Sequence, residues 1–106
     1  MVNLEAAKHM VGKGWHGILE EFYTKLNDLY PDVFPMQIKE KCGTLRIYFD
    51  HYTAESDRGV QALVIHAERA STHTCEVCGE LGKLRTDGDW DITLCDECST
   101  KDDMLS

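Results

Sequence analysis

The chain has 106 residues, of which 42% are hydrophobic and 28% charged, and its formal charge at pH 7 is −8. This length suits one small domain, and the composition excludes both a disordered chain and one embedded in a membrane. Acids outnumber bases by nineteen to eleven, which disfavours nucleic-acid binding driven by total charge. The N-terminus lacks the basic start and apolar stretch of a signal peptide, so we expect a cytoplasmic protein.

Apolar residues at helical spacing predict two helices in the first third of the chain. The first is short, with Asn3 as its N-cap, and glycines at positions 12 and 14 interrupt it. The second runs from Trp15 to Tyr30 and ends before Pro31, which cannot donate a hydrogen bond into a continuing helix. Its predicted inward face consists of Trp15, Ile18, Leu19, Phe22, Leu26, Leu29 and Tyr30.

Alternating apolar residues then predict a β-hairpin with one buried face, with its turn near Cys42 and Gly43. The helical period returns from about Ala54 to Ser71. Residues 1–71 therefore predict an α-β-β-α body in which two helices cover the hairpin. The predicted inward residues are Phe34, Met36, Ile38, Leu45, Ile47 and Phe49 in the hairpin, and Val60, Leu63, Val64, Ala67 and Ala70 in the last helix.

Four of the five cysteines form two pairs, Cys75-x-x-Cys78 and Cys95-x-x-Cys98, separated by sixteen residues. Each such turn directs two thiolates to one point, so two turns supply a tetrahedral set of four sulfur ligands. We expect one structural zinc ion, with rubredoxin-like iron as the competing metal. Two disulfides are the alternative, which a cytosolic chain seldom uses. Four cysteine ligands leave no position for water, so we predict no catalytic residue at this site.

The segment between the two pairs predicts a zinc-ribbon hairpin, because residues 81–85 and 90–94 can pair across a turn at Asp87-Gly88. The predicted fold is therefore α+β. It consists of a helix–β-hairpin–helix body over residues 1–71, a C-terminal four-cysteine zinc-ribbon hairpin over residues 72–98 and an acidic tail over residues 99–106.

The acidity is concentrated around the cysteines. Residues 1–70 hold ten acids and eight bases, whereas residues 71–106 hold nine acids and three bases. Four thiolates and one divalent ion would add about −2 to the charge of this segment. We therefore expect an acidic, partner-binding surface on the ribbon, formed by Asp87, Asp89, Asp91, Asp96 and Glu97.

Three other features have both a structural and a functional interpretation. Packing explains Trp15, and a helix-start turn with close backbone contact is favoured over a binding spot for residues 14–17. Cys42, the odd cysteine, is interpreted as an exposed thiol rather than a nucleophile. Residues 66–68 with Cys75 imitate part of the zinc-deaminase signature, but the two motifs lie too close together for that family.

Four motifs occur in this order: Gly-Trp-His-Gly at 14–17, a run from Gln to Tyr at 37–48, and the cysteine motifs at 75–79 and 94–98. Together they resemble a family of small phage- and prophage-encoded proteins without an established activity. Relatives usually have Phe-Gly-Gly in place of the Cys-Gly-Thr at 42–44, which weakens a catalytic interpretation of the cysteine there. The resemblance implies a mobile-element origin and a metal knuckle.

The predicted function is that of a non-enzymatic zinc-binding module for protein–protein interaction. Its expected partner is a host protein with a basic surface, because an acidic ribbon complements the basic grooves of proteins that handle nucleic acid. With the phage resemblance, this suggests a modulator in the host cytosol, for example an inhibitor of a defence system such as an anti-CRISPR protein.

The alternative is a zinc-ribbon regulator that binds nucleic acid itself. Its contacts would come from the hairpin and from Lys39, Lys41, Arg46 and Arg85. Tight, salt-dependent binding to oligonucleotides would favour this regulator over the protein-binding module.

Overall fold

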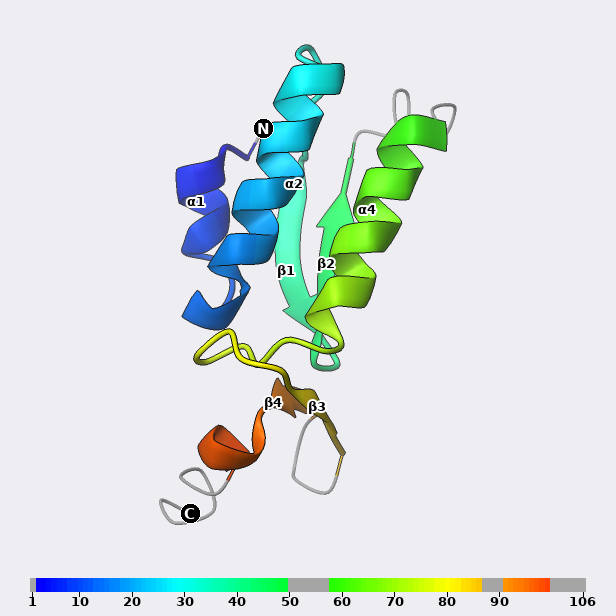
Figure 1. Cartoon of the computed structure of the whole chain (residues 1–106). Coiled ribbons are helices and arrows are strands. Elements are labelled where there is room, and N and C mark those ends of the chain that lie inside the picture. The colour runs from blue at the N-terminus through cyan, green and yellow to red at the C-terminus, as the bar shows by residue number, and fades with distance from the viewer. Residues whose placement is uncertain (1, 50–57, 87–90, 100–106) are drawn as a thin grey trace.

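The computed structural model describes residues 2–49, 58–86 and 91–99. Its elements in chain order are α1 (Leu4–Lys8), the 3₁₀ turn η1 (Lys13–Trp15), α2 (His16–Leu29), β1 (Gln37–Lys41), β2 (Thr44–Tyr48), α4 (Arg58–Ser71), β3 (Lys83–Arg85) and β4 (Ile92–Leu94). Figure 1 shows α2 and α4 across one face of the β1–β2 hairpin, with α1 beside α2 and the β3–β4 hairpin at the end of this body. The predicted α+β fold is confirmed. Among the described helices, none has the length and apolar composition needed to cross a membrane.

The two N-terminal helices form where the apolar spacing predicts them. α1 begins at Asn3, whose side-chain oxygen accepts a hydrogen bond from the Ala6 N–H at 2.8 Å. Leu29, predicted to face inward, lies in the last turn of α2 and is 62% exposed. The residues that α2 buries are Leu19, Phe22, Tyr23 and Leu26.

β1 and β2 form an antiparallel hairpin whose buried face carries Ile38, Leu45 and Ile47. The two loop residues, Cys42 and Gly43, both have positive φ angles, +55° and +78°. Two such residues are typical of a type I′ turn, whose twist matches that of the flanking strands. The hairpin therefore closes at the turn that the sequence predicts.

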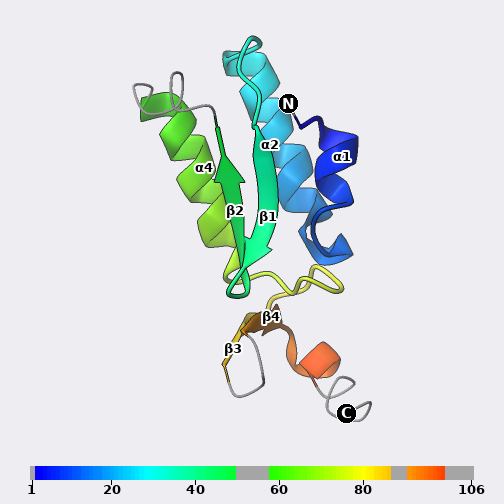
Figure 2. The ribbon, with the colours of Figure 1, turned by 180° about the vertical axis from the view of Figure 1, so that it is seen from behind.

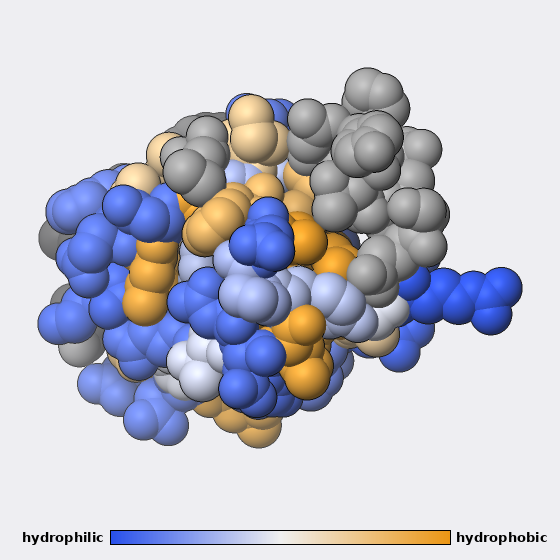
Figure 3. Space-filling view, turned by 90° about the horizontal axis from the view of Figure 1, so that it is seen from above, coloured by the Kyte–Doolittle hydropathy of each residue, from blue (hydrophilic) through white to orange (hydrophobic). Residues whose placement is uncertain are grey.

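Two residues predicted to face the core, Phe34 and Met36, lie outside it, with 39% and 52% of their surfaces exposed. Both precede β1, which begins at Gln37, so the inward alternation that includes Ile38 does not extend back to them. Figure 3 views the molecule from above Figure 1, at the end where α2 finishes and β1 begins, and shows apolar surface in separate patches between polar side chains.

α4 packs against α2 and covers the outer edge of β2. The Ser71 hydroxyl oxygen accepts a hydrogen bond from the Leu45 N–H at 2.9 Å, and Glu68 Oε2 accepts one from the Ile47 N–H at 3.1 Å. These side chains bind the N–H groups that a further strand would otherwise pair, which protects the edge of the sheet. The predicted inward residues that α4 buries are Val60 and Ala67.

β3 and β4 pair in antiparallel register, with Leu84 opposite Thr93. β3 starts later than predicted, and Leu81 instead makes an isolated bridge to Thr74. The predicted turn at Asp87-Gly88 lies outside the described residues, as does the acidic tail beyond residue 99. The hairpin brings the chain back so that the second cysteine pair returns beside the first.

Candidate metal centre

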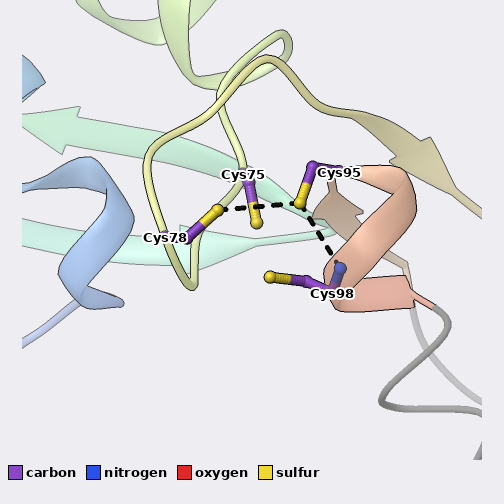
Figure 4. A group of neighbouring side chains, drawn as sticks. All are labelled: Cys75, Cys78, Cys95 and Cys98. Atoms are coloured by element: carbon purple, nitrogen blue, oxygen red, sulfur yellow. Dashed lines mark hydrogen bonds between the residues drawn. The ribbon is translucent and has the colours of Figure 1, made fainter.

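The structure brings the four paired cysteines together at the end of the ribbon. The Sγ atoms of Cys75, Cys78, Cys95 and Cys98 all lie within 4.8 Å of one another. Figure 4 shows the four side chains converging from two separate segments of the chain. None of them forms a disulfide, and the Sγ atoms of Cys78 and Cys95 lie 3.6 Å apart. Four sulfurs at these separations suit one metal ion bound at their centre.

Local backbone turns aim each pair inward. In the first pair, the Gly79 N–H donates to the Cys75 carbonyl oxygen at 3.0 Å and closes a tight turn. In the second, residues 96–99 form a short helical turn in which the Cys98 N–H donates to the Cys95 Sγ at 3.4 Å. A backbone N–H directed at a sulfur atom stabilises the thiolate form of that ligand.

Four thiols this close compete with one another for ionisation. Burial disfavours a charge on Cys75, but backbone hydrogen bonds around Cys95 and Cys78 outweigh this effect and lower the pKa of Cys75 to about 6. For Cys98, the hydrogen bond with the Cys95 sulfur and then burial raise the pKa to about 12. A bound cation resolves this competition, because its charge favours the thiolate form of all four ligands.

The first cysteine pair rests directly on the turn that precedes α2. The Gly14 N–H donates to the Glu76 carbonyl oxygen at 2.8 Å, and the Trp15 indole Nε1–H donates to the Thr74 carbonyl oxygen at 2.8 Å. A Cβ atom at Gly14 would overlap the Cys75 carbonyl oxygen, so the two backbones meet without room for a side chain. The interpretation of this run as a turn with close backbone contact is confirmed.

Glu76 joins the first cysteine pair to β4. Its N–H donates to the Thr93 carbonyl oxygen at 3.0 Å, and its carboxylate accepts from the Thr93 N–H at 3.0 Å. Burial raises the pKa of the half-buried Glu76 carboxyl; the Thr93 hydrogen bond opposes this rise, and the charge of Glu40 adds to it. The reciprocal bonds hold β4, and with it the second pair, beside the first.

The β1–β2 turn makes a second contact with the ribbon. The Thr93 hydroxyl, fully buried, donates to the Gly43 carbonyl oxygen at 2.6 Å. A Cβ atom at Gly43 would overlap the Leu84 side chain. The ribbon is therefore held against the body at two separate turns, each of which has a glycine at the point of contact.

Only part of the predicted acidic surface can be placed. Asp87 and Asp89 lie outside the described residues. Asp91 is partly buried just before β4, whereas Asp96 and Glu97 are exposed on the short helical turn that follows Cys95. The acids that can be placed thus lie on both sides of β4, and two of them lie within the second cysteine motif.

Arg85 is bound within the ribbon rather than directed toward a ligand. Its Nη2 donates to Asp96 Oδ1 at 2.8 Å and to the Leu94 carbonyl oxygen at 3.2 Å. The hydrogen bond with Arg85 holds the pKa of Asp96 below its usual range. This pair offsets part of the acidic charge of the ribbon, whereas the other predicted nucleic-acid contacts lie on another element. Those three, all on the β1–β2 hairpin, are Lys39, Lys41 and Arg46.

The other sequence features are not part of the four-sulfur group. Cys42 is exposed at the hairpin turn. Glu68 binds the edge of β2 through the Ile47 N–H, which gives the acid of the deaminase-like run a structural role. Neither residue belongs to the metal-ligating group found among the described residues.

Sequence reasoning missed Glu76 and Thr93 as the residues that fix the ribbon. Their bonds join positions that are 17 and 50 residues apart in the chain. No local periodicity or spacing signals such pairs. Comparison of the chain with protein-family models, with curated proteins and with solved structures gave no match.

Proposed function

We propose that this protein is a non-enzymatic, zinc-stabilised interaction module that binds a protein partner through its ribbon. The partner is a host protein with a basic surface, and the module acts as a phage-encoded modulator of host defence or of nucleic-acid handling. The observation that carries this proposal is the ribbon, which exposes acidic and large apolar side chains on a backbone fixed to the body at two turns.

Zinc is the metal that these ligands favour, because four soft thiolates in a tetrahedral set suit it and leave no open position for water. The same closed set argues for a structural ion. We expect one zinc ion per purified chain by elemental analysis, and none of the visible absorption of an iron–thiolate centre. Cys75→Ser and Cys98→Ser should lose the ion, whereas Cys42→Ser, which changes a cysteine outside the group, should retain it. Retention of metal by both ligand variants would rule out this site.

The ribbon surface combines charge with apolar contact. Leu81 is 83% exposed and lines a hollow of about 310 Å³ beside Cys95, together with Lys83 and Asp96. Exposed apolar side chains ringed by charged ones are typical of protein-binding surfaces. The charged lining of this hollow is Lys83, Arg85 and Asp96, so the acids that would steer a basic partner are those of the neighbouring helical turn, Asp96 and Glu97.

Charge-neutralised variants test this surface. The ribbon triple variant is Asp91→Asn, Asp96→Asn and Glu97→Gln, and the matched control is Glu5→Gln, Asp28→Asn and Asp32→Asn on the body. Partners captured from bacterial lysate by the wild-type chain would be identified by mass spectrometry and titrated against both variants. We expect the ribbon variant to bind about tenfold more weakly with a flatter salt dependence, and the control to match the wild type. Equal binding by the two variants would overturn the acidic-surface proposal.

A further inference from the structure

The β1–β2 hairpin has an open face on the side away from the helices. Figure 2 shows this face in front, with no described helix covering it. The register places Lys39 opposite Arg46 and Lys41 opposite Thr44, and alternation along β2 puts Tyr48 on the same face. Lysines two residues apart on a strand are about 7 Å apart along it. The hairpin thus presents a short row of cations on an otherwise acidic protein.

A groove between β2 and α4 extends this basic face. Its volume is about 240 Å³, and its charged lining residues are Arg46, Glu68 and Arg69. The Glu68 carboxylate already accepts a hydrogen bond from the Ile47 N–H. The Arg46 Nε atom is buried and has no hydrogen-bond partner among the described residues. A buried guanidinium N–H without a partner is costly, so a shift of the Arg46 side chain that brings this N–H to a ligand oxygen would be stabilising.

An aromatic ring stands among these cations. Tyr48 is 40% exposed, and the Lys39 Nζ lies 5.3 Å from the centroid of its ring. The contact with Lys39 steadies the ring within the face. Cations interspersed with an exposed aromatic ring are the combination by which proteins bind single-stranded nucleic acid, with phosphates on the cations and a base on the ring.

We propose that this basic face, formed by Lys39, Lys41, Arg46, Tyr48 and Arg69, binds single-stranded nucleic acid through its phosphates. The total charge of −8 opposes this contact only weakly, because at physiological salt a charge acts over about 8 Å and residues 1–70, with ten acids and eight bases, are nearly balanced. Glu40 lies on the opposite face of β1, and its carboxylate binds the Gly43 N–H at 2.6 Å. The face is distinct from the ribbon surface, so a test of nucleic-acid binding by the hairpin is independent of a test of protein binding by the ribbon.

The test is a fluorescence-anisotropy titration of the metal-loaded full chain with a labelled single-stranded oligonucleotide of about 12 nucleotides. Three or four phosphate contacts should give a slope of log Kd against log salt of about 2 to 3. Lys41→Gln and Arg46→Gln should each weaken binding and reduce this slope by about 0.7. Lys13→Gln removes an equal charge from the exposed η1 turn and should leave the affinity and the salt slope unchanged.

Substitution of the aromatic ring supplies a second, independent readout. Tyr48→Phe keeps the stacking surface and should bind like the wild type, whereas Tyr48→Leu should bind about 5- to 100-fold more weakly. Circular dichroism and thermal unfolding of each variant separate loss of binding from loss of fold. No binding at low salt, or an equal loss in Lys13→Gln, would overturn the proposal. Equal affinity for a polyglutamate peptide of the same charge would also overturn it, in favour of an acidic protein ligand.

Discussion

Gly14 and Gly17 lie three residues apart, yet their surroundings differ completely. A Cβ atom at Gly14 would overlap the backbone of the first cysteine pair, whereas a Cβ atom at Gly17 would meet nothing within 4 Å. Gly17 lies in the first turn of α2, where alanine is the better helix former. Of these two residues, only Gly14 needs to be a glycine for the ribbon to rest on the body.

We expect Gly14→Ala to lower the free energy of unfolding by about 2 kcal/mol, because the added methyl group forces the two backbones apart. It should also weaken zinc binding at least tenfold, although Gly14 is not a ligand, since Cys75 and Cys78 lose their support. Gly17→Ala should instead raise stability by about 0.5 kcal/mol. Urea unfolding and competition with a zinc chelator measure both effects. Equal behaviour of the two variants would show that the contact at Gly14 does not matter.

A buried tyrosine gives the body a dependence on alkaline pH. The Tyr23 hydroxyl donates to the Val2 carbonyl oxygen at 2.7 Å, and burial raises the pKa of Tyr23 from 10 to about 12. Below pH 10 the phenol is protonated in both states and its contribution to stability is fully present. Between pH 10 and 12 the unfolded chain loses the proton first, so the free energy of unfolding falls.

Tyr23→Phe should lack this alkaline component and should lose about 1 kcal/mol at neutral pH with the hydrogen bond. Urea unfolding of the two proteins below pH 10 and between pH 10 and 12 separates the contributions. The expected result is a smaller fall for the variant, because contributions from other groups are common to both proteins. The same fall in both would mean that Tyr23 ionises normally in the folded state.

At the scale of elements, α4 does more than cover the hairpin with apolar side chains. Its Ser71 and Glu68 bind two successive outward N–H groups of β2, at Leu45 and Ile47. The helical spacing of apolar residues predicts that α4 packs on the sheet, but it does not predict that polar side chains of the same helix complete the edge of β2. That role depends on how closely α4 approaches β2, and on which of its side chains then face the Leu45 and Ile47 N–H groups.

Ser71→Ala should cost about 1–3 kcal/mol of stability, because the fully buried Leu45 N–H loses its acceptor. Thr72→Ala is the matched control: Thr72 directly follows α4, and its exposed hydroxyl donates to the Arg69 carbonyl oxygen in the last turn of that helix. The control should change stability by no more than about 0.5 kcal/mol. Thermal and urea unfolding would measure both, and equal stability of Ser71→Ala and the wild type would show that water can replace the hydroxyl.

At the scale of the whole molecule, hydrogen bonds connect the cysteine cluster to the body. The Trp15 indole is fully buried and donates to the carbonyl oxygen of Thr74, next to the first ligand. The hydrogen bond between Glu76 and Thr93 fixes one cysteine pair relative to the other, and the bond from Thr93 to Gly43 fixes both relative to the β1–β2 turn. Loss of the ion should therefore change the surroundings of Trp15 in the body as well as the structure of the ribbon.

Metal removal tests this link. In a Trp90→Phe background, Trp15 is the remaining tryptophan and its fluorescence reports on the contact with Thr74. We expect a chelator to shift its emission toward that of an exposed indole and to lower the unfolding temperature, with recovery on adding zinc. Cys42→Ser should respond identically. An unchanged emission spectrum with the metal gone would mean that the ribbon contacts persist without the ion.

The local features of this protein are readable from its sequence. Cysteine spacing identified the four sulfurs that the fold brings together, and apolar periods of helix and strand located α2, the β1–β2 hairpin and α4. These features are readable because each depends on residues near one another in the chain. The same reasoning misplaced Phe34 and Met36, since alternation does not reveal where a strand begins.

The contacts between the ribbon and the body are visible only in the folded chain. In the folded chain, Glu76 and Thr93 join the two halves of the ribbon, Arg85 pairs with Asp96, and Arg46 of the hairpin lies beside Arg69 of α4. Each of these outcomes depends on contacts between segments far apart in the sequence, whose geometry follows from packing rather than from local pattern. The charge of −8 and the acidic excess of residues 71–106 follow from the sequence alone; the fold decided that Lys39, Lys41 and Arg46 lie on one face of the hairpin.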